Sequence, residues 1–575
     1  MSAPTPFSPD PKPPEMPEGD PTRASRLQAA RTLQAQQQYA QAAALCESLL
    51  TSAPRDFDVL LLLGILKAET QQLDQSVDLL CRAVEVRPGS FEAYYALGYA
   101  MCKLQQFAAG VECFDQCLAL NPAYAEAACD RGSALVELGQ DQAALESYAL
   151  AITLRPAYSD AWSNQGNALL ALGQTDAAIA SFDHALTLNP RSAATHLNLG
   201  NAYQAAGEAA LALSSYDQAI ALQPNYLLAL ANRFAPLKQQ HRLDEAVASC
   251  NQALALDPQH ADTYWNRGLA LLLQGNLRQG FADYHWRWKR AAFAPIKRNF
   301  HQPLWLGDTP VRGKTVLLHA EQGLGDSIQF CRYARDVRAL GAEILLEVPQ
   351  PLMALFETLE GPKQLFEKGS ALPHFDYHCP LLSLPLAFHT QLVNIPSPSP
   401  YLASTAPKRQ LWQRHLGVPS KSRIGLVWSG NVLDRGDRQR SLDLQTLLPH
   451  LPSSFEYLCL QKELRPADQD AMQANSIRFL GAHIQDFSDT AALCDLVDLV
   501  ISVDTSVAHL ACALGKPTWI LLPYAPDWRW MLDRADSPWY PSARLYRQGN
   551  DRSWTPVLAR IGSDLLGYAR VPLVP

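Results

Sequence analysis

Small and apolar positions recur through the first half of the chain with a fixed spacing of 34 residues. Prolines occupy positions 54, 88, 122, 156, 190, 224 and 258. Ten residues after each proline stand Gly64, Gly98, Gly132, Gly166, Gly200, Phe234 and Gly268. Small residues let two helices approach closely, and proline cannot continue a helix. The period therefore predicts an all-α superhelix of helix–turn–helix units over residues 23–290.

Beyond residue 290 the spacing is lost, and short apolar runs alternate with amphipathic segments. Strands are expected at 314–321 and 342–348, around a helix at 327–340. A second series of strands is expected at 424–428, 457–460, 477–480, 499–503 and 517–522, with helices at 441–451, 489–496 and 505–514. This alternation predicts two α/β lobes built on parallel sheets. The stretch at 394–400, rich in proline and serine, is expected to connect them.

These patterns divide the chain into four segments. They are a disordered proline-rich tail (1–22), a solenoid of about eight repeats (23–290), a first α/β lobe (291–400) and a second α/β lobe with a C-terminal helix (401–575). The aromatic and basic segment at 284–290 is expected to pack the last repeat onto the first lobe, although it could also form a nucleic-acid patch.

Composition narrows the functional class. The 575 residues carry a net charge of −8, which argues against a general nucleic-acid binder. No run of about 18 apolar residues is present, so no membrane span is expected. The N-terminus lacks the apolar core of a signal peptide, and the twelve cysteines form no C-x-x-C pair. These features predict a soluble cytoplasmic protein.

A row of polar residues lies inside the repeats, eight positions after successive prolines. Its members are Asp130, Asn164, Asn198, Asn232 and Asn266. Stacking of the units would align them near the inner face of the solenoid. Two interpretations remain open: the amides hydrogen-bond the backbone of an extended acceptor peptide, or they bond one repeat to the next.

The second lobe contains a candidate anion site. The strand at 499–503 delivers Asp504, Thr505 and Ser506 to the start of a helix, where free N–H groups favour a phosphate. Alternatively, Asp504 or Thr505 only caps that helix. Three arginines, Arg435, Arg438 and Arg440, follow the first strand of this lobe and could clamp a diphosphate, or form a solvated cluster. Lys462 ends the next strand and is a further candidate cation.

The first lobe offers a candidate base. Gly323, Gly325 and Asp326 follow its first strand and open a helix, so that Asp326 either caps the helix or faces the cleft as a general base. The D-x-D sequence at 468–470 lies in a polar segment and is expected to be a solvated face, so no metal site is predicted.

Several motifs together resemble known families. The 34-residue period resembles the tetratricopeptide repeat, and its polar row resembles that of protein O-GlcNAc transferases, which grip acceptor polypeptides. The segments EQGLGDSIQF (321–330), VDTSVAHL (503–510), PDWRW (526–530) and DSPWY (536–540) resemble a bacterial family of tetratricopeptide-fused glycosyltransferases. The catalytic region of that family is similar to glycosyltransferase family nine, the ADP-heptose:lipopolysaccharide heptosyltransferases.

The resemblance implies a GT-B fold, in which two Rossmann-like lobes hold a nucleotide-sugar mainly through the second lobe. It implies that Asp326 is the catalytic base and that Arg440 assists the leaving group. The residues expected to contact the nucleotide-sugar are Gly323, Gly325, Trp428, Asn431, Arg438, Gln461, Lys462, Asp504, Thr505, Ser506 and His509. The acceptor is expected to contact Asn164, Asn198, Asn232 and Asn266. The tract at 431–440 departs most from the heptosyltransferase pattern, which leaves sugar and base open.

The sequence thus predicts a metal-independent, inverting glycosyltransferase that uses a nucleotide-sugar co-substrate and no other cofactor. Its repeats would present a protein or peptide acceptor. A different class is also open: a non-catalytic scaffold whose α/β region senses a nucleotide-sugar. Epimerisation of a sugar nucleotide on the same two-lobe fold is a third alternative.

Overall fold

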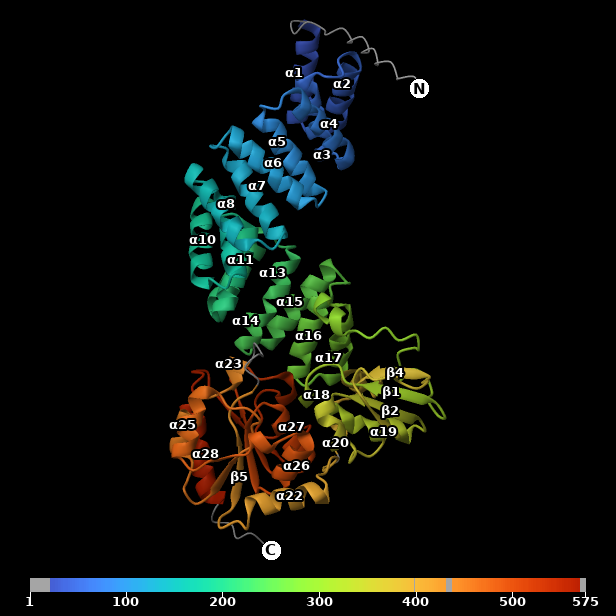
Figure 1. Cartoon of the computed structure of the whole chain (residues 1–575), viewed down its shortest axis with the longest axis vertical. Coiled ribbons are helices and arrows are strands. Elements are labelled where there is room, and N and C mark those ends of the chain that lie inside the picture. Colours follow the sequence, from blue (N-terminus) through green and yellow to red (C-terminus); the bar gives the residue numbers. More distant parts are fainter. Residues whose placement is uncertain (1–20, 398, 431–436, 569–575) are drawn as a thin grey trace, which may run out of the picture. The chain divides into compact units, whose positions relative to one another are not determined.

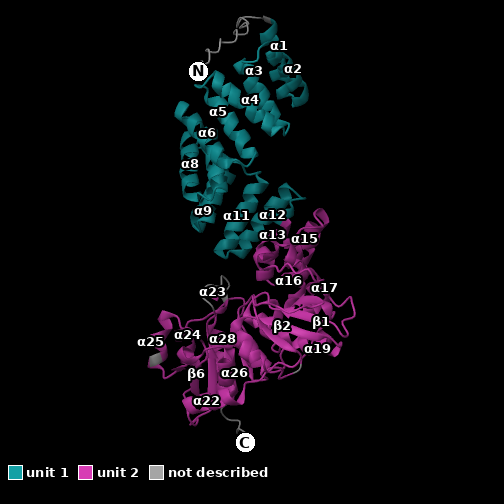
Figure 2. Cartoon of the chain, turned by 45° about the vertical axis from the view of Figure 1, so that its right-hand side comes forward, with its two compact units in different colours: residues 1–229 teal, residues 230–575 magenta. Residues whose placement is uncertain are grey.

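A computed structural model describes residues 21–397, 399–430 and 437–568. Contacts within the chain divide it into two compact units (Figure 2), Met1–Ala229 and Leu230–Pro575, which we call the N-terminal and C-terminal units. The boundary falls inside the repeat region. The last repeats therefore belong to the same compact unit as the α/β sheets.

The N-terminal unit is built from helix pairs joined by short turns, which confirms the predicted repeats (Figure 1). The pairs are α1 (Pro21–Ala35) with α2 (Tyr39–Ser52), α3 (Phe57–Glu69) with α4 (Leu73–Val86), α5 (Phe91–Lys103) with α6 (Phe107–Leu120), α7 (Ala125–Glu137) with α8 (Asp141–Leu154), α9 (Ser159–Ala171) with α10 (Thr175–Leu188) and α11 (Ala193–Ala206) with α12 (Ala209–Leu222).

The repeated glycine allows the two helices of each pair to touch. A Cβ atom on Gly132, Gly166 or Gly200 would lie 2.5–2.6 Å from an aromatic ring of the partner helix. These rings belong to Tyr148, Phe182 and Tyr216, which are buried. A side chain at the glycine would overlap the ring, so the 34-residue spacing records a steric requirement.

The unit with phenylalanine at the glycine position solves the same packing problem differently. Its first helix is interrupted, giving α13 (Leu227–Asn232) and α14 (Phe234–Gln239), followed by α15 (Leu243–Leu256). Phe234 is buried, and small Cys250 takes the position that an aromatic ring occupies in neighbouring repeats. Pro236 lies in the first turn of α14, where its ring is incompatible with a continuing helix. In this unit the large residue is on the first helix and the small residue is on the second helix, which is the reverse of the neighbouring repeats.

The last repeat, α16 (Ala261–Leu273) and α17 (Leu277–Tyr284), continues into a short 3₁₀ helix, η1 (His285–Lys289). Arg287 on η1 is fully buried and donates to Glu321, at 2.7 Å, and to Ser383, at 2.9 Å. Trp286 stacks on Tyr264 with 3.9 Å between ring centroids. The aromatic and basic segment therefore packs the last repeat against the first lobe, as the sequence predicts.

The first α/β sheet has four parallel strands. They are β1 (Thr315–His319), β2 (Glu343–Val348), β3 (Gln364–Glu367) and β4 (Tyr377–Pro380), in the order β3-β2-β1-β4. The predicted strands correspond to β1 and β2. The predicted helix between them begins earlier, as α18 (Leu324–Phe330), and continues through η3 (Cys331–Tyr333) into α19 (Ala334–Ala339). Strands β3 and β4 are short and partly exposed, so their apolar pattern is weak.

The second sheet has six parallel strands. They are β5 (Arg423–Val427), β6 (Glu456–Cys459), β7 (Arg478–Phe479), β8 (Leu499–Val503), β9 (Thr518–Leu522) and β10 (Ala543–Arg547), in the order β10-β9-β8-β5-β6-β7. Counted from β5, this is the doubly wound order 3-2-1-4-5-6 of Rossmann sheets. The strand order reverses between β5 and β8, and ligands of such sheets bind at that point.

The helices around the second sheet include α22 (Ala406–Leu416), α25 (Pro466–Ala474), α26 (Phe487–Asp495), α27 (Ser506–Ala513) and α28 (Thr555–Tyr568). Helices α26, α27 and α28 meet the expectations at 489–496, 505–514 and the C-terminus. The helix expected at 441–451 is only α24 (Leu444–Leu447) followed by η7 (Leu448–His450), which contains Pro449. A proline there does not extend the α-helix.

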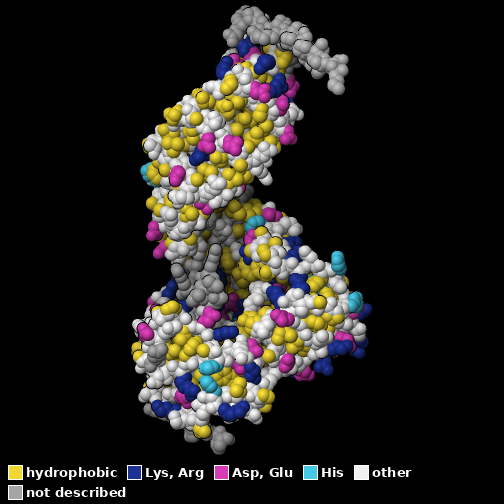
Figure 3. Space-filling model, in the orientation of Figure 1, with side chains coloured by type: hydrophobic (Ala, Val, Ile, Leu, Met, Phe, Trp, Pro, Cys, Tyr) yellow, Lys and Arg dark blue, Asp and Glu magenta, His cyan; other side chains and the backbone are white. Residues whose placement is uncertain are grey.

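Two surface properties complete the fold. In the described part of the chain, no helix combines the length and the apolar character needed to span a membrane. On the face in Figure 3, Lys and Arg side chains of the described residues are interspersed with Asp and Glu.

Candidate functional site

A cleft of about 1170 Å³ lies within the C-terminal unit and receives residues from three sources. The loop after β1 contributes residues 322–326, and the carboxyl ends of β5, β6 and β8 contribute Val427, Ser429 and Gly430, residues 460–466 and residues 504–507. Lys238, Trp265, Leu269 and Tyr284 come from the last repeats. The cleft thus reaches the strand-order reversal between β5 and β8, where the topology predicts a ligand.

The start of α27 opens into this cleft. Thr505 is the N-cap residue, but its side chain makes no capping hydrogen bond; its hydroxyl lies 3.1 Å from the hydroxyl of Ser502. The first N–H groups of a helix have no acceptor within the helix. Thr505 therefore does not cap α27 through its side chain. Thr505 and Ser506 both line the cleft, and anion binding at this helix start stays a prediction.

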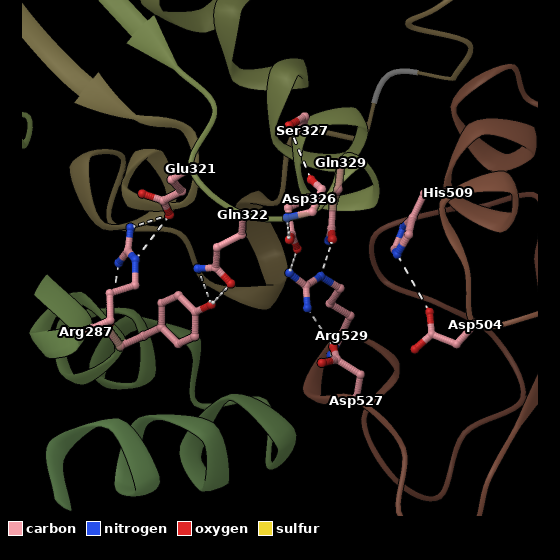
Figure 4. A network of polar contacts seen from close by, with 12 residues as sticks. Arg287, Glu321, Gln322, Asp326, Ser327, Gln329, Asp504, His509, Asp527 and Arg529 are labelled. Atoms are coloured by element: carbon pink, nitrogen blue, oxygen red, sulfur yellow. Dashed lines mark hydrogen bonds and ion pairs between the residues drawn. The ribbon is translucent and has the colours of Figure 1, made fainter. Parts of the chain in front are cut away.

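The partly buried Asp504 and the buried His509 form a pair at this helix (Figure 4). Asp504 Oδ1 lies 3.8 Å from His509 Nε2, and His509 Nδ1 lies 2.9 Å from the hydroxyl of Tyr540. Burial and the nearby Asp527 charge raise the pKa of Asp504 to about 6. Burial lowers the pKa of His509 to about 3, so its imidazole is neutral near pH 7. The pair therefore carries at most one negative charge.

Asp326 lies on the opposite side of the cleft, in the first turn of α18. Its Oδ2 accepts a hydrogen bond of 2.8 Å from the N–H of Gly323. Its Oδ1 forms an ion pair with Arg529. The capping expected of Asp326 is thus present, through a bond back to the N-cap backbone, and the same carboxylate also lines the cleft. Burial raises the pKa of Asp326, and the Arg529 charge opposes that rise.

Gly325 allows α18 to lie close to α27, and Gly323 precedes it in the same loop. A Cβ atom on Gly325 would lie 2.9 Å from Cδ2 of His509, so a side chain at this position would push the two helices apart. Gly323 lines the cleft and supplies the N–H that Asp326 accepts. Both glycines therefore lie where the sequence predicts contact with the ligand.

Arg440, the predicted leaving-group residue, lines the same cleft. Its guanidinium would be 3.0 Å from a Cβ on Gly430, and it lies 3.7 Å from Asp437. Arg465 also lines the cleft and pairs with Asp437, although sequence reasoning did not single it out. Asn431 and Arg435 fall outside the described residues, as does the side chain of Arg438.

Lys462 lines the cleft as expected, and its Nζ donates to the carbonyl of Gln485 at 3.2 Å. Gln461 also lines the cleft, but its side chain is occupied by the local fold. Its Oε1 accepts from the N–H groups of Trp428 and Ser429, at 2.8 and 3.1 Å. The structure therefore assigns Gln461 to holding the loop after β5.

The predictions for Trp428 and Asp468 are wrong because the two side chains are buried and hydrogen-bonded to each other. Trp428 is 1% exposed, is absent from the cleft walls and belongs to the core beneath the second sheet. Its indole N–H donates to Asp468 at 2.9 Å. Asp468 is itself buried, so it is not the solvated residue expected of the D-x-D sequence; Asp470 is exposed. The indole N–H of Trp428 and the carboxylate of Asp468 are both buried, and each is the hydrogen-bond partner of the other.

Arg529 is the most connected cleft residue that sequence reasoning missed. The motif PDWRW contains it, but nothing in the motif indicates that it crosses from the second lobe to α18. Lys238 was missed as well, because it belongs to a repeat helix. Burial lowers the pKa of Lys238, and the Asp527 charge opposes that effect.

The polar row of the repeats makes contacts to the preceding repeat. The hydroxyl of Tyr95 donates to Asp130 at 2.8 Å, Asn164 Nδ2 lies 3.7 Å from the sulfur of Cys129, and Asn266 Nδ2 donates to the carbonyl of Ala231 at 3.3 Å. These partners share an offset of 35 residues, which is the signature of bonding between repeats. Asn198 and Asn232 are half-buried. The row therefore serves packing at three positions, and a role in acceptor binding stays a prediction.

No group of three or more His, Cys, Asp and Glu residues in the described ranges is arranged to hold a metal ion.

Comparison with known proteins identifies the repeats. Families described as tetratricopeptide repeats match residues 33–102, 95–159 and 193–226, and a family described as TPR repeat matches 166–207 and 237–275. The chain contains tetratricopeptide repeats.

One curated relative is Protein FlbA of Caulobacter vibrioides, 25% identical over 337 residues, which are 53% of this chain and 54% of FlbA. The match thus spans about half the length of that relative.

Among solved structures, the Cut9–Hcn1 hetero-tetramer of the APC/C is similar with a TM-score of 0.38 and 16% identity, over 42% of this chain and 48% of that one. YrrB, titled a TPR protein with an unusual peptide-binding site, has a TM-score of 0.28 and 23% identity, over 32% of this chain and 95% of its own.

Proposed function

We propose that this protein is a glycosyltransferase with a GT-B fold, which transfers a sugar from a nucleotide-sugar to a hydroxyl group of a protein or peptide. One observation carries the proposal: the open N-terminus of α27 and the guanidinium of Arg440 share a single cleft with the Asp326 carboxylate. The first pair suits an anionic diphosphate, and the carboxylate suits a hydroxyl that must lose a proton.

The donor would lie along the carboxyl edge of the six-stranded sheet. Its diphosphate would accept hydrogen bonds from the backbone at the start of α27 and from the hydroxyls of Thr505 and Ser506. Arg440, Lys462 and Arg465 would supply the positive charge that stabilises the departing nucleoside diphosphate. The size of the cleft, about 1170 Å³, leaves room for a nucleotide-sugar together with an acceptor side chain.

Asp326 would act as the general base. An ionised carboxylate has about four acceptor sites, so hydrogen bonds from Gly323 and Arg529 leave room for an acceptor hydroxyl. That hydroxyl would give its proton to Asp326 while its oxygen attacks the anomeric carbon, and the bond from that carbon to the diphosphate would break. This displacement inverts the anomeric configuration and assigns no step to a metal ion.

The repeats would bring the acceptor to this cleft. Tetratricopeptide repeats present extended surfaces to protein partners. Trp265 and Tyr284 of the last repeat form part of the cleft wall that also contains Asp326. A polypeptide bound by the repeats would therefore extend directly from them into the cleft. The proposed location is the cytoplasm, and the twelve free cysteines support it.

A second function has one observation in its favour. Both oxygens of Asp326 are already engaged, by Gly323 and by Arg529. Such an arrangement would also suit a non-catalytic scaffold whose cleft binds a nucleotide-sugar and reports its presence to partners of the repeats. Binding without turnover is what distinguishes this alternative.

The substitution Asp326→Asn tests the proposal. It keeps the shape of the side chain but removes the proton acceptor, so we expect nucleoside diphosphate release from UDP-, GDP- and ADP-sugars to fall by about 10²–10⁴-fold. Binding of the free nucleoside diphosphates, followed by thermal shift, should survive.

Asp376→Asn is the matched control for this experiment. Asp376 also accepts a backbone N–H, that of Thr315 at 2.8 Å, and pairs with Lys314, but it lies outside the cleft walls. Full turnover by Asp326→Asn would remove Asp326 from the base role. Binding by the unchanged chain without turnover of any donor would favour the scaffold.

A further inference from the structure

Arg529 lines the cleft and joins the two lobes through its side-chain contacts (Figure 4). Each of its three guanidinium nitrogens binds a different residue. Nη2 pairs with Asp326, and Nε donates to Gln329 Oε1 at 2.6 Å; both partners belong to α18 of the first lobe. Nη1 donates at 2.8 Å to Asp527, in the same loop as Arg529 itself.

Arg529 and Asp326 are both largely shielded from solvent, so water does not replace a contact that either side chain loses. The side chain of Arg529 is 9% exposed, and that of Asp326 is 17% exposed. A buried cation that lost its carboxylate partners would be left with a large, uncompensated desolvation cost. The three bonds of Arg529 are therefore needed together to stabilise its charge. Lysine could supply the charge but not the planar, three-way fork.

We propose that Arg529 is a positioning residue for the transfer reaction, which fixes the Asp326 carboxylate at the junction of the two lobes and keeps it in the ionised form. This inference rests on the proposed function, in which Asp326 is the base.

Other charges that face Asp326 do not replace Arg529. Arg287 on η1 already binds Glu321, to whose Oε1 it donates at 2.7 Å. Asp527 and Glu321 are acids and favour the protonated form of Asp326, and the Tyr284 phenol is directed to Gln322. The charge of Lys238 interacts with that of Asp527. Arg529 is thus the cation in direct contact with the carboxylate.

Loss of the Arg529 charge is expected to raise the pKa of Asp326. Burial raises the pKa of Asp326, and Arg529 is the largest influence that lowers it. Removing an adjacent opposite charge raises the pKa of a carboxyl by about 1–3 units. Without Arg529, Asp326 would remain protonated to a higher pH and could not accept the hydroxyl proton there.

A double-mutant cycle tests the contact without requiring turnover. We expect Arg529→Gln to lower the melting temperature by several degrees in the unchanged chain, and by much less in the Asp326→Asn background. Losses that simply add would show that Arg529 does not hold Asp326, and would overturn the inference. Arg529→Lys keeps the charge and serves as the variant for the cycle if the glutamine variant does not fold.

The pH dependence of nucleoside diphosphate release, with the same UDP-, GDP- and ADP-sugar panel, tests the proton affinity. We expect the acidic limb for Arg529→Gln to move upward by about 1–3 pH units, and to return toward its original position in Arg529→Lys. UDP and ADP binding should change less than twofold in both.

Arg534→Gln is the control, since Arg534 is an arginine of the same segment that pairs with Asp536 outside the cleft. An unmoved limb with reduced rate would mean a purely structural role, and loss of UDP or ADP binding would mean that Arg529 holds the donor; either result overturns the inference. If the unchanged chain turns over no donor, the proposed function fails, and the melting-temperature cycle still decides whether Arg529 holds Asp326.

Discussion

At the scale of single residues, burial and neighbouring charge decide which cleft groups are ionised. Asp326 has an arginine in contact, whereas Asp504 has a histidine that is neutral because burial lowers its pKa to about 3. The two carboxyl groups share one cleft, and burial raises the pKa of both. The contacts that stabilise their charged forms differ, since Asp326 is in an ion pair with Arg529 and Asp504 lies beside a neutral imidazole.

Asp504→Asn should stabilise the protein at high pH. The pKa of Asp504 is raised to about 6 in the fold, so the unfolded chain releases this proton at lower pH and stability falls as pH rises between about 4 and 6. Asparagine imitates the protonated form. The variant should therefore be more stable than the unchanged chain at pH 8, by about 3 kcal/mol at most, and similar to it near pH 4.

Thermal unfolding at pH 4 and pH 8 provides the measurement. Asp470→Asn, an exposed change in the same lobe, should show no such pH-dependent difference. An Asp504→Asn variant that is equally destabilised at both pH values would mean that Asp504 is held as a stabilising anion.

At the scale of elements, the close contact between paired helices explains the sequence period. The glycine of one helix faces an aromatic ring of the next, and the pair Phe234 and Cys250 reverses this order of sizes. The spacing of 34 residues therefore conserves the combined volume of two facing positions rather than one residue type.

Gly166→Ala should destabilise the N-terminal unit. Its Cβ would lie 2.6 Å from the ring of Phe182, and overpacking of this kind costs about 1–3 kcal/mol. Chemical denaturation followed by circular dichroism measures the loss. Adding Phe182→Leu should recover part of it, because the smaller side chain makes room for the methyl group.

Gly89→Ala is the matched control, since a Cβ on Gly89 meets no atom within 4 Å. If the two alanine variants lost equal stability, backbone effects of alanine rather than the contact between helices would be responsible.

At the scale of the whole molecule, the compact units do not follow the division between repeats and sheets. Residues Leu230–Pro575 include the last repeats, and Lys238, Trp265 and Tyr284 on those repeats line the cleft together with both sheets. The last repeats are thus part of the structure that forms the site.

A ligand of the cleft should therefore protect helices α14, α16 and α17 as well as the sheets. Binding to the folded form stabilises the unit that contains the site by mass action. We expect UDP or ADP to slow hydrogen exchange across the C-terminal unit, including these repeat helices, and to leave α3 to α10 of the N-terminal unit unchanged.

Hydrogen exchange followed by mass spectrometry resolves these regions. Ser506→Glu, which places a negative charge at the start of α27, should abolish the protection. Equal protection of α3 to α10 would contradict the division into two units.

Features that depend on local repetition could be predicted from the amino-acid pattern alone. The 34-residue period specified the repeats, the apolar runs specified β1, β2 and β8, and the transition from β8 to Asp504 and Thr505 located the start of a helix. These features need only neighbouring residues, because helix ends and buried strands are determined by short-range geometry. The candidate residues from Gly323 to Asp326 were found in the same way.

Which of these residues contact one another became visible only in the folded chain. Arg529 reaches Asp326 across 203 positions, and Lys238 reaches the cleft from a repeat helix. Trp428 looked accessible at the end of a strand but turns into the core, where Asp468 accepts its N–H. These contacts depend on the packing of distant elements and on the pairing of buried polar groups. Neither property produces a repeating pattern of residues in the sequence.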